Sequence, residues 1–404
     1  MTPFQQTADA AIPELAGVQR RALLVGGAAA IVSAVGAFVN LDQFLSSYLM
    51  AYMFCLGITL GCMALGMVHQ LSGGAWGVVL RRPIGAASRV LPVLTLLFLP
   101  ILFGMKHLYV WTNADIVAHD EALRHKALYL NTPFWIVRAA FYFAVWNTLS
   151  FFLNRWSLQQ DETGDPWIAR KMQKMSAGGL LLYGLTITFA SFDWLMSLEP
   201  HWFSTIFGAI IMAGQGLSAL AFLLVIIIWL SRRPPLDTVI VRDHFHDVSN
   251  LMLAFVMLWA YFSFSQYLII WAGNLPTEIS WYQHRLDTGW RLLGTFLMLF
   301  HFAVPFTLLL LRVVKRTPDY LLKLVVGVLV VRVIDLLWMI APEFHAGFGV
   351  SWMDVTLPIA LFGVWGAAFV WQLRGRAILP VHDPEFDDAL GKIIERGGEP
   401  RHAH

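Results

Sequence analysis

Apolar residues in this chain gather in long runs, and each run is bounded by charged or turn-forming residues. Roughly 20 helical residues span the hydrocarbon core of a bilayer, so each run is long enough to cross a membrane as an α-helix. The runs predict ten such helices, in residues 22–41, 44–69, 90–110, 132–154, 176–198, 202–230, 248–272, 290–312, 321–341 and 353–373. The more polar residues 1–21 and 374–404 predict an N-terminal segment and a C-terminal tail that flank one ten-helix membrane domain, residues 22–373.

The composition supports this interpretation. Of the 404 residues, 58% are hydrophobic and only 13% are charged, whereas charged residues make up about a quarter of an ordinary soluble chain. A soluble enzyme is therefore excluded, and the fold class we predict is an all-α polytopic membrane protein. The net charge of +2 gives no sign of a nucleic-acid partner.

Basic residues are distributed unevenly between the loops on the two sides of the predicted domain. One side receives seventeen, before the tail is counted, and the other receives four, Arg124, Lys126, Arg285 and Arg291. Cytoplasmic loops carry the excess of Lys and Arg, so we expect both termini in the cytoplasm of a bacterium and the chain in its inner membrane. The first helix follows a polar N-terminus without a credible cleavage site, and we expect it to be retained.

Several kinds of chemistry lack the residues they need. Cys55 and Cys62 are the only cysteines, so neither a disulfide framework nor a cysteine-ligated metal or iron–sulfur cluster is expected. A membrane haem usually takes two histidines at one depth, and His69, His107 and His301 are predicted at three different depths. Phosphate-binding loops, nucleophile elbows and zinc-ligand clusters are also missing, which argues against a hydrolase or an ATP-driven pump.

Ionisable side chains inside a bilayer cost several kcal/mol unless they are paired or hydrated, so each is a functional candidate. Seven lie more than two residues inside the ends of the predicted spans: Lys106, His107, Arg138, Asp193, His301, Arg332 and Asp335. At about 1.5 Å per residue, the first four fall in the outer half of the membrane and the last three near its middle. The cytoplasmic half has fewer polar groups, mainly His69, His244, His246 and Asp247. This distribution is typical of a half-channel that opens outward.

Each candidate also has a simpler explanation. Arg332 and Asp335 are three residues apart on one helix face and could form a static ion pair or belong to a proton-conducting chain. Asp193 could accept a proton or be hydrated from the nearby loop. Lys106 and Arg138, each taken alone, are close enough to the interface to snorkel. His301 could bond a neighbouring helix, relay protons or contact a quinone ring.

Four prolines inside three spans predict kinks that neighbouring helices absorb. They are Pro92, Pro100, Pro305 and Pro358. Their positions in the third, eighth and tenth spans do not mirror one another, and we infer no internal symmetry from the sequence.

Several stretches resemble the second quinol-oxidoreductase membrane subunits of bacterial alternative complex III, which are polysulfide-reductase-type (NrfD-like) proteins. They run from the second span to the tail and cover most of the chain. The stretches are Ser72-Gly73-Gly74-Ala75-Trp76-Gly77 with Arg81-Arg82, Ser191-Phe192-Asp193-Trp194-Leu195-Met196-Ser197-Leu198-Glu199-Pro200-His201-Trp202, Asp243-His244-Phe245-His246-Asp247 with Asn250-Leu251, Leu258-Trp259-Ala260-Tyr261-Phe262-Ser263-Phe264-Ser265-Gln266, Ile269-Ile270-Trp271-Ala272-Gly273-Asn274-Leu275-Pro276 with Trp281-Tyr282, and Leu379-Pro380-Val381-His382-Asp383-Pro384.

This resemblance implies a ten-helix subunit of a complex that oxidises quinol and reduces a cytochrome c or an oxidase. The implied partners are a sister NrfD-like subunit, an iron–sulfur subunit, multihaem cytochrome c subunits and small membrane subunits. The c-type haems and iron–sulfur clusters are expected in those partners, and the sister subunit is the better candidate for the quinol site. The resemblance also implies a proton-conducting role for Asp193, His301, Arg332 and Asp335, and with less weight for Lys106, His107 and Arg138. One departure is Gly85, where the family commonly has an acidic residue.

Two other classes of function remain open from the sequence. A secondary transporter would need a cavity at the midplane, broken helices and two related halves. A purely structural scaffold would hold its buried charges as static ion pairs. The composition does not separate such a scaffold from a proton conductor.

Overall fold

The computed structural model describes residues 14–233, 236, 240–345 and 347–374, and within them the chain forms helices and no strands. Ten helical segments are long and apolar enough to cross a membrane, which confirms the all-α, ten-span fold. They are Glu14–Val39 (α2), Leu41–Ser72 (α3), Arg81–Phe103 (α5 to α7), Thr132–Thr163 (α11), Pro166–Leu198 (α12 and η2), Phe207–Leu230 (α13), Arg242–Gly273 (α14), Trp290–Leu310 (α16, η4 and α17), Pro318–Glu343 (α19 and η5) and Met353–Leu373 (α20).

Several helices extend further than the apolar runs predict, because helical hydrogen bonding continues through polar turns outside the hydrocarbon. The clearest case is α11, which continues to Thr163, and α12, which begins at Pro166. Gly164 ends α11 with a left-handed φ of 64°, and the Asp165 side chain accepts the Trp167 N–H at 2.9 Å. A glycine after one helix and a capping Asp with proline before the next make this a tight reversal.

Helix α2 begins at Glu14, so residues 14–21 of the predicted N-terminal segment are helical and continuous with the first span. Residues 1–13 and 375–404, including the tail motif, lie outside the described residues.

Prolines interrupt two of the spans. The third consists of α5 (Arg81–Ser88), α6 (Leu91–Leu96) and α7 (Leu99–Phe103). The eighth consists of α16 (Trp290–Leu297), the π-helix η4 (Met298–Ala303) and α17 (Val304–Leu310). Pro305 has no N–H to donate to the His301 carbonyl, which explains the change of helical pitch just before it. By contrast, α20 continues through Pro358.

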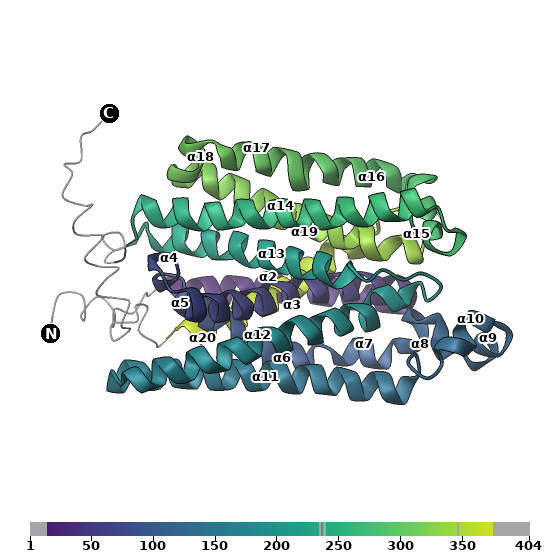
Figure 1. The fold of residues 1–404 in the computed structure, drawn as a ribbon, viewed down its shortest axis with the longest axis horizontal. Coiled ribbons are helices and arrows are strands. Elements are labelled where there is room, and N and C mark those ends of the chain that lie inside the picture. Colours follow the sequence, from purple (N-terminus) through teal and green to yellow (C-terminus); the bar gives the residue numbers. More distant parts are fainter. Residues whose placement is uncertain (1–13, 234–235, 237–239, 346, 375–404) are drawn as a thin grey trace.

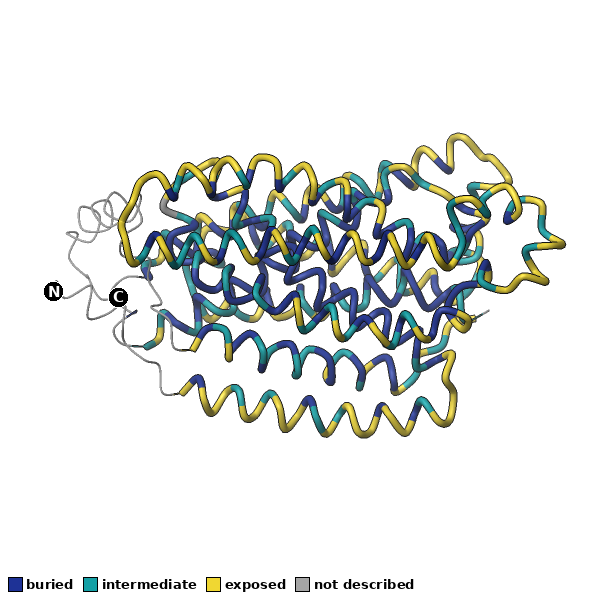
Figure 2. Tube along the Cα trace, turned by 90° about the horizontal axis from the view of Figure 1, so that it is seen from below, coloured by how far each residue is buried: buried dark blue, intermediate teal, exposed yellow. Residues whose placement is uncertain are grey.

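Eight of the spans form two sets of four, with α3 and α13 side by side at the centre (Figure 1). The first quartet consists of α3, α5 to α7, α11 and α12. The second quartet consists of α13, α14, α16 to α17 and α19. Both α3 and α13 are mostly buried, and the dark core in Figure 2 runs along the middle of the molecule, whereas the peripheral helices expose residues along much of their length. Those exposed apolar residues are the surface that lipid would cover.

The first and last helices form a pair on the side of α3. Gly26 of α2 and Gly363 of α20 meet so closely that a Cβ added to Gly26 would lie 2.9 Å from the Gly363 Cα. Small residues allow such close backbone contact in membrane helices. Helix α20 also packs on α3, which links this pair to the first quartet.

Short helices mark the two ends of the bundle (Figure 1). At the loop end lie α8 (Met105–Leu108), η1 (Val110–Thr112), α9 (Ala114–His119), α10 (Glu121–Lys126) and α15 (Pro276–Leu286). At the arginine end lie α4 (Ala75–Val78), α18 (Arg312–Arg316) and the start of α5 with Arg81 and Arg82.

Candidate functional site

A buried ion pair joins α11 and α12 near the loop end. The Arg138 Nε and Nη2 atoms each donate to a carboxylate oxygen of Asp193 at 2.8 Å. The Tyr142 hydroxyl donates to Asp193 Oδ2 at 2.7 Å, and the Arg138 Nη1 donates to the Tyr129 carbonyl at 2.9 Å. A bidentate guanidinium and a phenol therefore satisfy the carboxylate almost completely.

Aromatic rings enclose this first site. The Arg138 guanidinium lies 3.9 Å from the ring centre of Tyr129 and 4.3 Å from that of Phe134, and the Trp135 indole donates to the Asp193 carbonyl at 3.0 Å. Arg138 is only 8% exposed. The expectation that Arg138 snorkels is therefore wrong, because its charge is neutralised by Asp193 inside the bundle.

A second buried ion pair lies in the second quartet. Arg332 and Asp335, one turn apart on α19, are in direct contact, and both are buried. The space for the guanidinium depends on Gly214 of α13, since a Cβ there would lie 2.2 Å from Arg332 Nη2. Arg332 also lines a small cavity of about 10 Å³, together with Gln215 and Ser218 of α13, which is about the size of one water.

The carboxylate of this second site is less completely satisfied than that of the first. Within the described residues, Asp335 Oδ1 and Gln215 Nε2 are buried without a hydrogen-bond partner. The same holds for both ring nitrogens of His301, which lies on η4, fully buried, with its ring centre 3.9 Å from that of Trp259. Since η4 packs on α19, the sequence-predicted residues His301, Arg332 and Asp335 are brought into one region.

Two of the predicted candidates lie elsewhere. The side chains of Lys106 and His107 on α8 are exposed at the loop end. His107 Nδ1 lies 2.7 Å from Asp42 Oδ1 at the start of α3. The structure therefore does not place them with either buried pair, and their part in a proton path stays a prediction.

Sequence reasoning missed an ionic group at the loop end. Arg285 of α15 is fully buried, contacts the Glu343 carboxylate at 2.7 Å and donates to the Met339 carbonyl at 2.9 Å. Its guanidinium lies 3.6 Å from the Trp281 ring centre. Burial lowers the pKa of Arg285, and burial with the nearby Glu343 charge raises the pKa of Glu199. The sequence placed Arg285 in a loop, and only the aromatic Trp281 one turn before it hinted at burial.

A buried carboxylate on α20 was also missed. Asp354 accepts hydrogen bonds from Ser47 Oγ at 2.6 Å, from Gln43 Nε2 at 3.2 Å and from the Ser351 N–H at 2.8 Å. The Ser351-x-x-Asp354 spacing is the sequence signature of a helix capping box and could have identified the last of these bonds. The group ties α20 to α3 and is structural.

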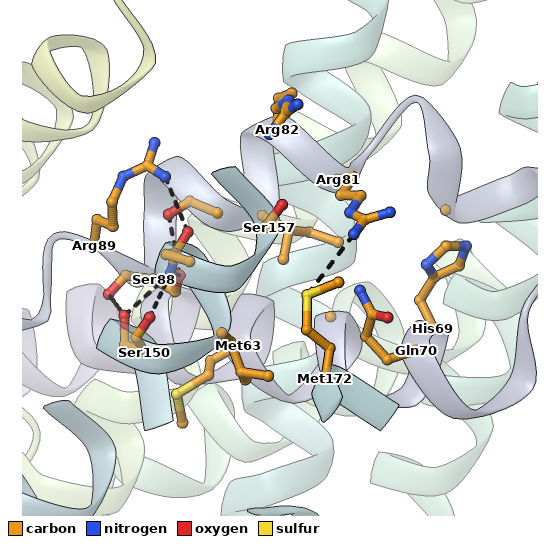
Figure 3. Close-up of a pocket in the computed structure, with 16 residues that line it drawn as sticks. Met63, His69, Gln70, Arg81, Arg82, Ser88, Arg89, Ser150, Ser157 and Met172 are labelled. Carbon is orange, nitrogen blue, oxygen red and sulfur yellow. Dashed lines mark hydrogen bonds between the residues drawn. The ribbon is translucent and has the colours of Figure 1, made fainter. Parts of the chain in front are cut away.

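The arginine end contains a cavity of about 60 Å³ between α3, α5, α11 and α12. Arg89 lies on one side of it and His69 on the other, while Arg81 reaches toward Met172 (Figure 3). Asp161 pairs with Arg82. Gly85, where the resemblance leads one to expect an acid, faces Asn154, since a Cβ there would lie 2.8 Å from Asn154 Oδ1.

The two cavities described above do not fit a quinone. Neither cavity has room for a quinone ring, since small-molecule pockets enclose several hundred Å³. Both cysteines are buried and free. No group of three or more His, Cys, Asp or Glu side chains able to hold a metal is found in the part of the chain that the structure describes. We therefore derive no step through a quinone or a metal bound to this chain.

The fold and its two buried acid–base pairs define an all-α membrane protein of ten spans. Comparison with models of known protein families gives no match for this chain, and comparison with curated proteins gives none either.

Proposed function

We propose that the chain is an integral membrane subunit of a bacterial quinol:cytochrome c oxidoreductase, an NrfD-like subunit of an alternative complex III. In this proposal it supports quinol oxidation carried out by partner subunits and conducts protons through a half-channel that opens outward at the loop end. It has no redox metal of its own. The complex lies in the inner membrane, with the arginine end and both termini in the cytoplasm.

The observation that carries the proton-conducting role is the pair of buried carboxylates, Asp193 and Asp335, one in each quartet. A buried ion pair is weak evidence for stability, because apolar residues of similar volume often serve as well or better. Ionisable groups in membrane spans commonly mark ion and proton pathways. The partial satisfaction of Asp335 and His301 favours protonation chemistry there, since a static site would leave fewer buried polar atoms unpaired.

The motif resemblance supports the role in a complex. It includes Asp193 itself within Ser191-Phe192-Asp193-Trp194, at the end of α12. The partners proposed are the sister NrfD-like subunit, an iron–sulfur subunit, multihaem cytochrome c subunits and small membrane subunits, with the quinone pool as the source of electrons.

A specific observation favours a second candidate, a structural scaffold. The Asp193 carboxylate accepts three hydrogen bonds from Arg138 and Tyr142, as expected of a static pair. If every buried pair behaves in this way, the chain holds its partners together without moving protons.

Affinity purification of the tagged full-length chain from its native membrane, followed by reconstitution in proteoliposomes, tests the proposal. We expect multihaem and iron–sulfur subunits to co-purify, and quinol oxidation to release protons in a ratio to electrons that falls in Asp335→Asn. An unchanged ratio in an assembled, active Asp335→Asn complex would favour the scaffold. A chain that purifies alone and accumulates a solute in liposomes would indicate a transporter.

A further inference from the structure

The two quartets contact each other reciprocally. Helix α3, the first helix of its quartet, packs on the first and fourth helices of the other quartet, α13 and α19. Helix α13 likewise packs on the first and fourth helices of the first quartet, α3 and α12. Within each quartet the first and third helices both contact the second and fourth. Reciprocal contacts of this kind are what a two-fold axis produces, here between the halves of one chain.

The third helices of the two quartets, α11 and the segment α16 to α17, also have similar sequences. Residues 141–149 and 300–308 read Phe-Tyr-Phe-Ala-Val-Trp-Asn-Thr-Leu and Phe-His-Phe-Ala-Val-Pro-Phe-Thr-Leu, identical at six of nine positions. This alignment places Tyr142 opposite His301. The comparison of proline positions missed it, because Trp146 stands where the second copy has Pro305.

The same alignment, continued without a gap toward the loop end, places Lys126 opposite Arg285. Lys126 donates to the Pro200 carbonyl at 2.5 Å, and Arg285 donates to the Met339 carbonyl. In each quartet, therefore, a cation from the connection between the second and third helices bonds the chain at the end of the fourth helix.

The fourth helices align in the same way. A leucine stands two positions after each of Asp193 and Asp335, and a proline stands seven positions after each, at Pro200 and Pro342. Asp193 lies five residues before Leu198 of η2, and Asp335 lies eight residues before Glu343 of η5, the last helical residues of their segments. By helical rise they are roughly 7 and 12 Å from those ends. Asp335 is thus nearer the loop end than the midplane position expected for it.

The equivalent sites differ in how the carboxylate is held. In the first quartet the guanidinium comes from the third helix, and Tyr142 completes the bonds of Asp193. In the second, Arg332 comes from the fourth helix itself, and Asp335 Oδ1 is without a partner among the described residues. A phenol keeps its proton near neutral pH, whereas an imidazole gains and loses one there.

We infer that the two sites are copies of one duplicated acid–base site that have diverged: Arg138–Asp193 is a permanent ion pair, and Asp335 is the carboxylate that takes up and releases a proton by exchange with His301. This inference rests on the proposed proton-conducting function. Neither ring nitrogen of His301 nor Asp335 Oδ1 has a hydrogen-bond partner among the described residues, so the exchange runs through a bridging water. The N–H bond of the imidazolium breaks as the water gains that proton, and an O–H bond of the water breaks as the O–H bond of Asp335 forms. Arg332 carries its charge throughout, and no electrons move.

Infrared difference spectroscopy of the full-length chain in nanodiscs tests the inference without relying on the complex. We expect the pH-dependent protonated-carboxyl signal of the wild type, to which Glu199 also contributes, to lose one band in Asp335→Asn and to keep that band in Asp193→Asn. The surroundings of Asp335 simplify the titration, because the charged group in contact with it is Arg332. Arg332 in turn lines the small cavity with the neutral Gln215 and Ser218 and with apolar residues. A band that is absent in the wild type, or lost in Asp193→Asn, overturns the inference.

Substituting the ring beside each carboxylate gives a second test that keeps both ion pairs. Tyr142→Phe is expected to leave the band unchanged, whereas His301→Tyr slows the exchange of Asp335 with deuterium oxide at least tenfold. Equal exchange rates in His301→Tyr and the wild type would contradict the role of His301. The proton-to-electron ratio of the reconstituted complex is measured separately: if Asp335 titrates but the ratio does not depend on it, the proposed function fails and the assignment of the exchanging site stands.

Discussion

Removing one partner of the Arg138–Asp193 pair is expected to destabilise the protein far more than removing both. Asp193→Ala leaves the Arg138 charge buried against Tyr129 and removes the acceptor of the Tyr142 hydroxyl. Breaking a buried pair in this way costs about 3–5 kcal/mol. The double variant Arg138→Met/Asp193→Leu replaces the pair with apolar groups and is expected to lie within about 1 kcal/mol of the wild type or above it.

Unfolding of the purified full-length chain in mixed micelles, followed by tryptophan fluorescence, measures these differences. Trp135 and Trp194 lie beside the pair and are fully buried, so their emission reports its environment. The double-mutant cycle gives the interaction energy between Arg138 and Asp193 directly. The matched control is Asp42→Ala, which breaks the exposed contact with His107 and is expected to have little effect. Single variants that each cost less than about 1 kcal/mol and add without coupling would refute the reasoning.

Three further predictions concern other contacts. Gly214→Ala is expected to displace the Arg332 guanidinium, because the new Cβ would lie 2.2 Å from it, and therefore to lower the melting temperature. The control is Gly178→Ala, whose new Cβ would have no atom within 4 Å; it should instead stabilise the protein by up to about 1 kcal/mol. Asp354→Ala leaves buried donors unpaired and is expected to cost about 1–3 kcal/mol, measured by the same unfolding assay. Because the pKa of Glu199 is raised by burial and by Glu343, the folded state binds its proton more tightly than the unfolded state; stability from this group is present below pH 4.5 and is lost as the pH rises through the folded pKa. Melting temperatures measured against pH should therefore fall less steeply above pH 4.5 in Glu199→Gln than in the wild type, and parallel curves would contradict the assignment.

The spans were predictable because the property that forms them is local. A run of apolar residues determines where a helix can cross a bilayer, and all ten runs correspond to helices. The helix ends were less predictable, because turns such as Gly164-Asp165 lie well beyond the apolar boundary of α11. The ion pair of Arg332 and Asp335 was also local, since a separation of three residues places both on one face.

The remaining site features depend on packing between distant segments. Asp193 and Arg138 are 55 positions apart, and nothing in either helix alone indicates that they meet. Arg285 looked like an ordinary loop residue, and only its contacts with Glu343 and Trp281 show it to be buried. The duplicated site required the order of helix contacts first, because the matching stretches are short and their prolines differ.

The pairing of α2 with α20 has a consequence for how the protein is made. Helix α2 buries only four residues, Leu15, Gly26, Ser33 and Gly36. Both glycines lie against α20. Ribosomes make α2 before α20, so α2 must wait in lipid while the spans between them are made before its contact with α20 can form. Translation products that stop before α20 should therefore expose Gly26 and Gly36 to lipid. Membrane quality-control proteases could recognise incomplete chains by this exposed glycine surface.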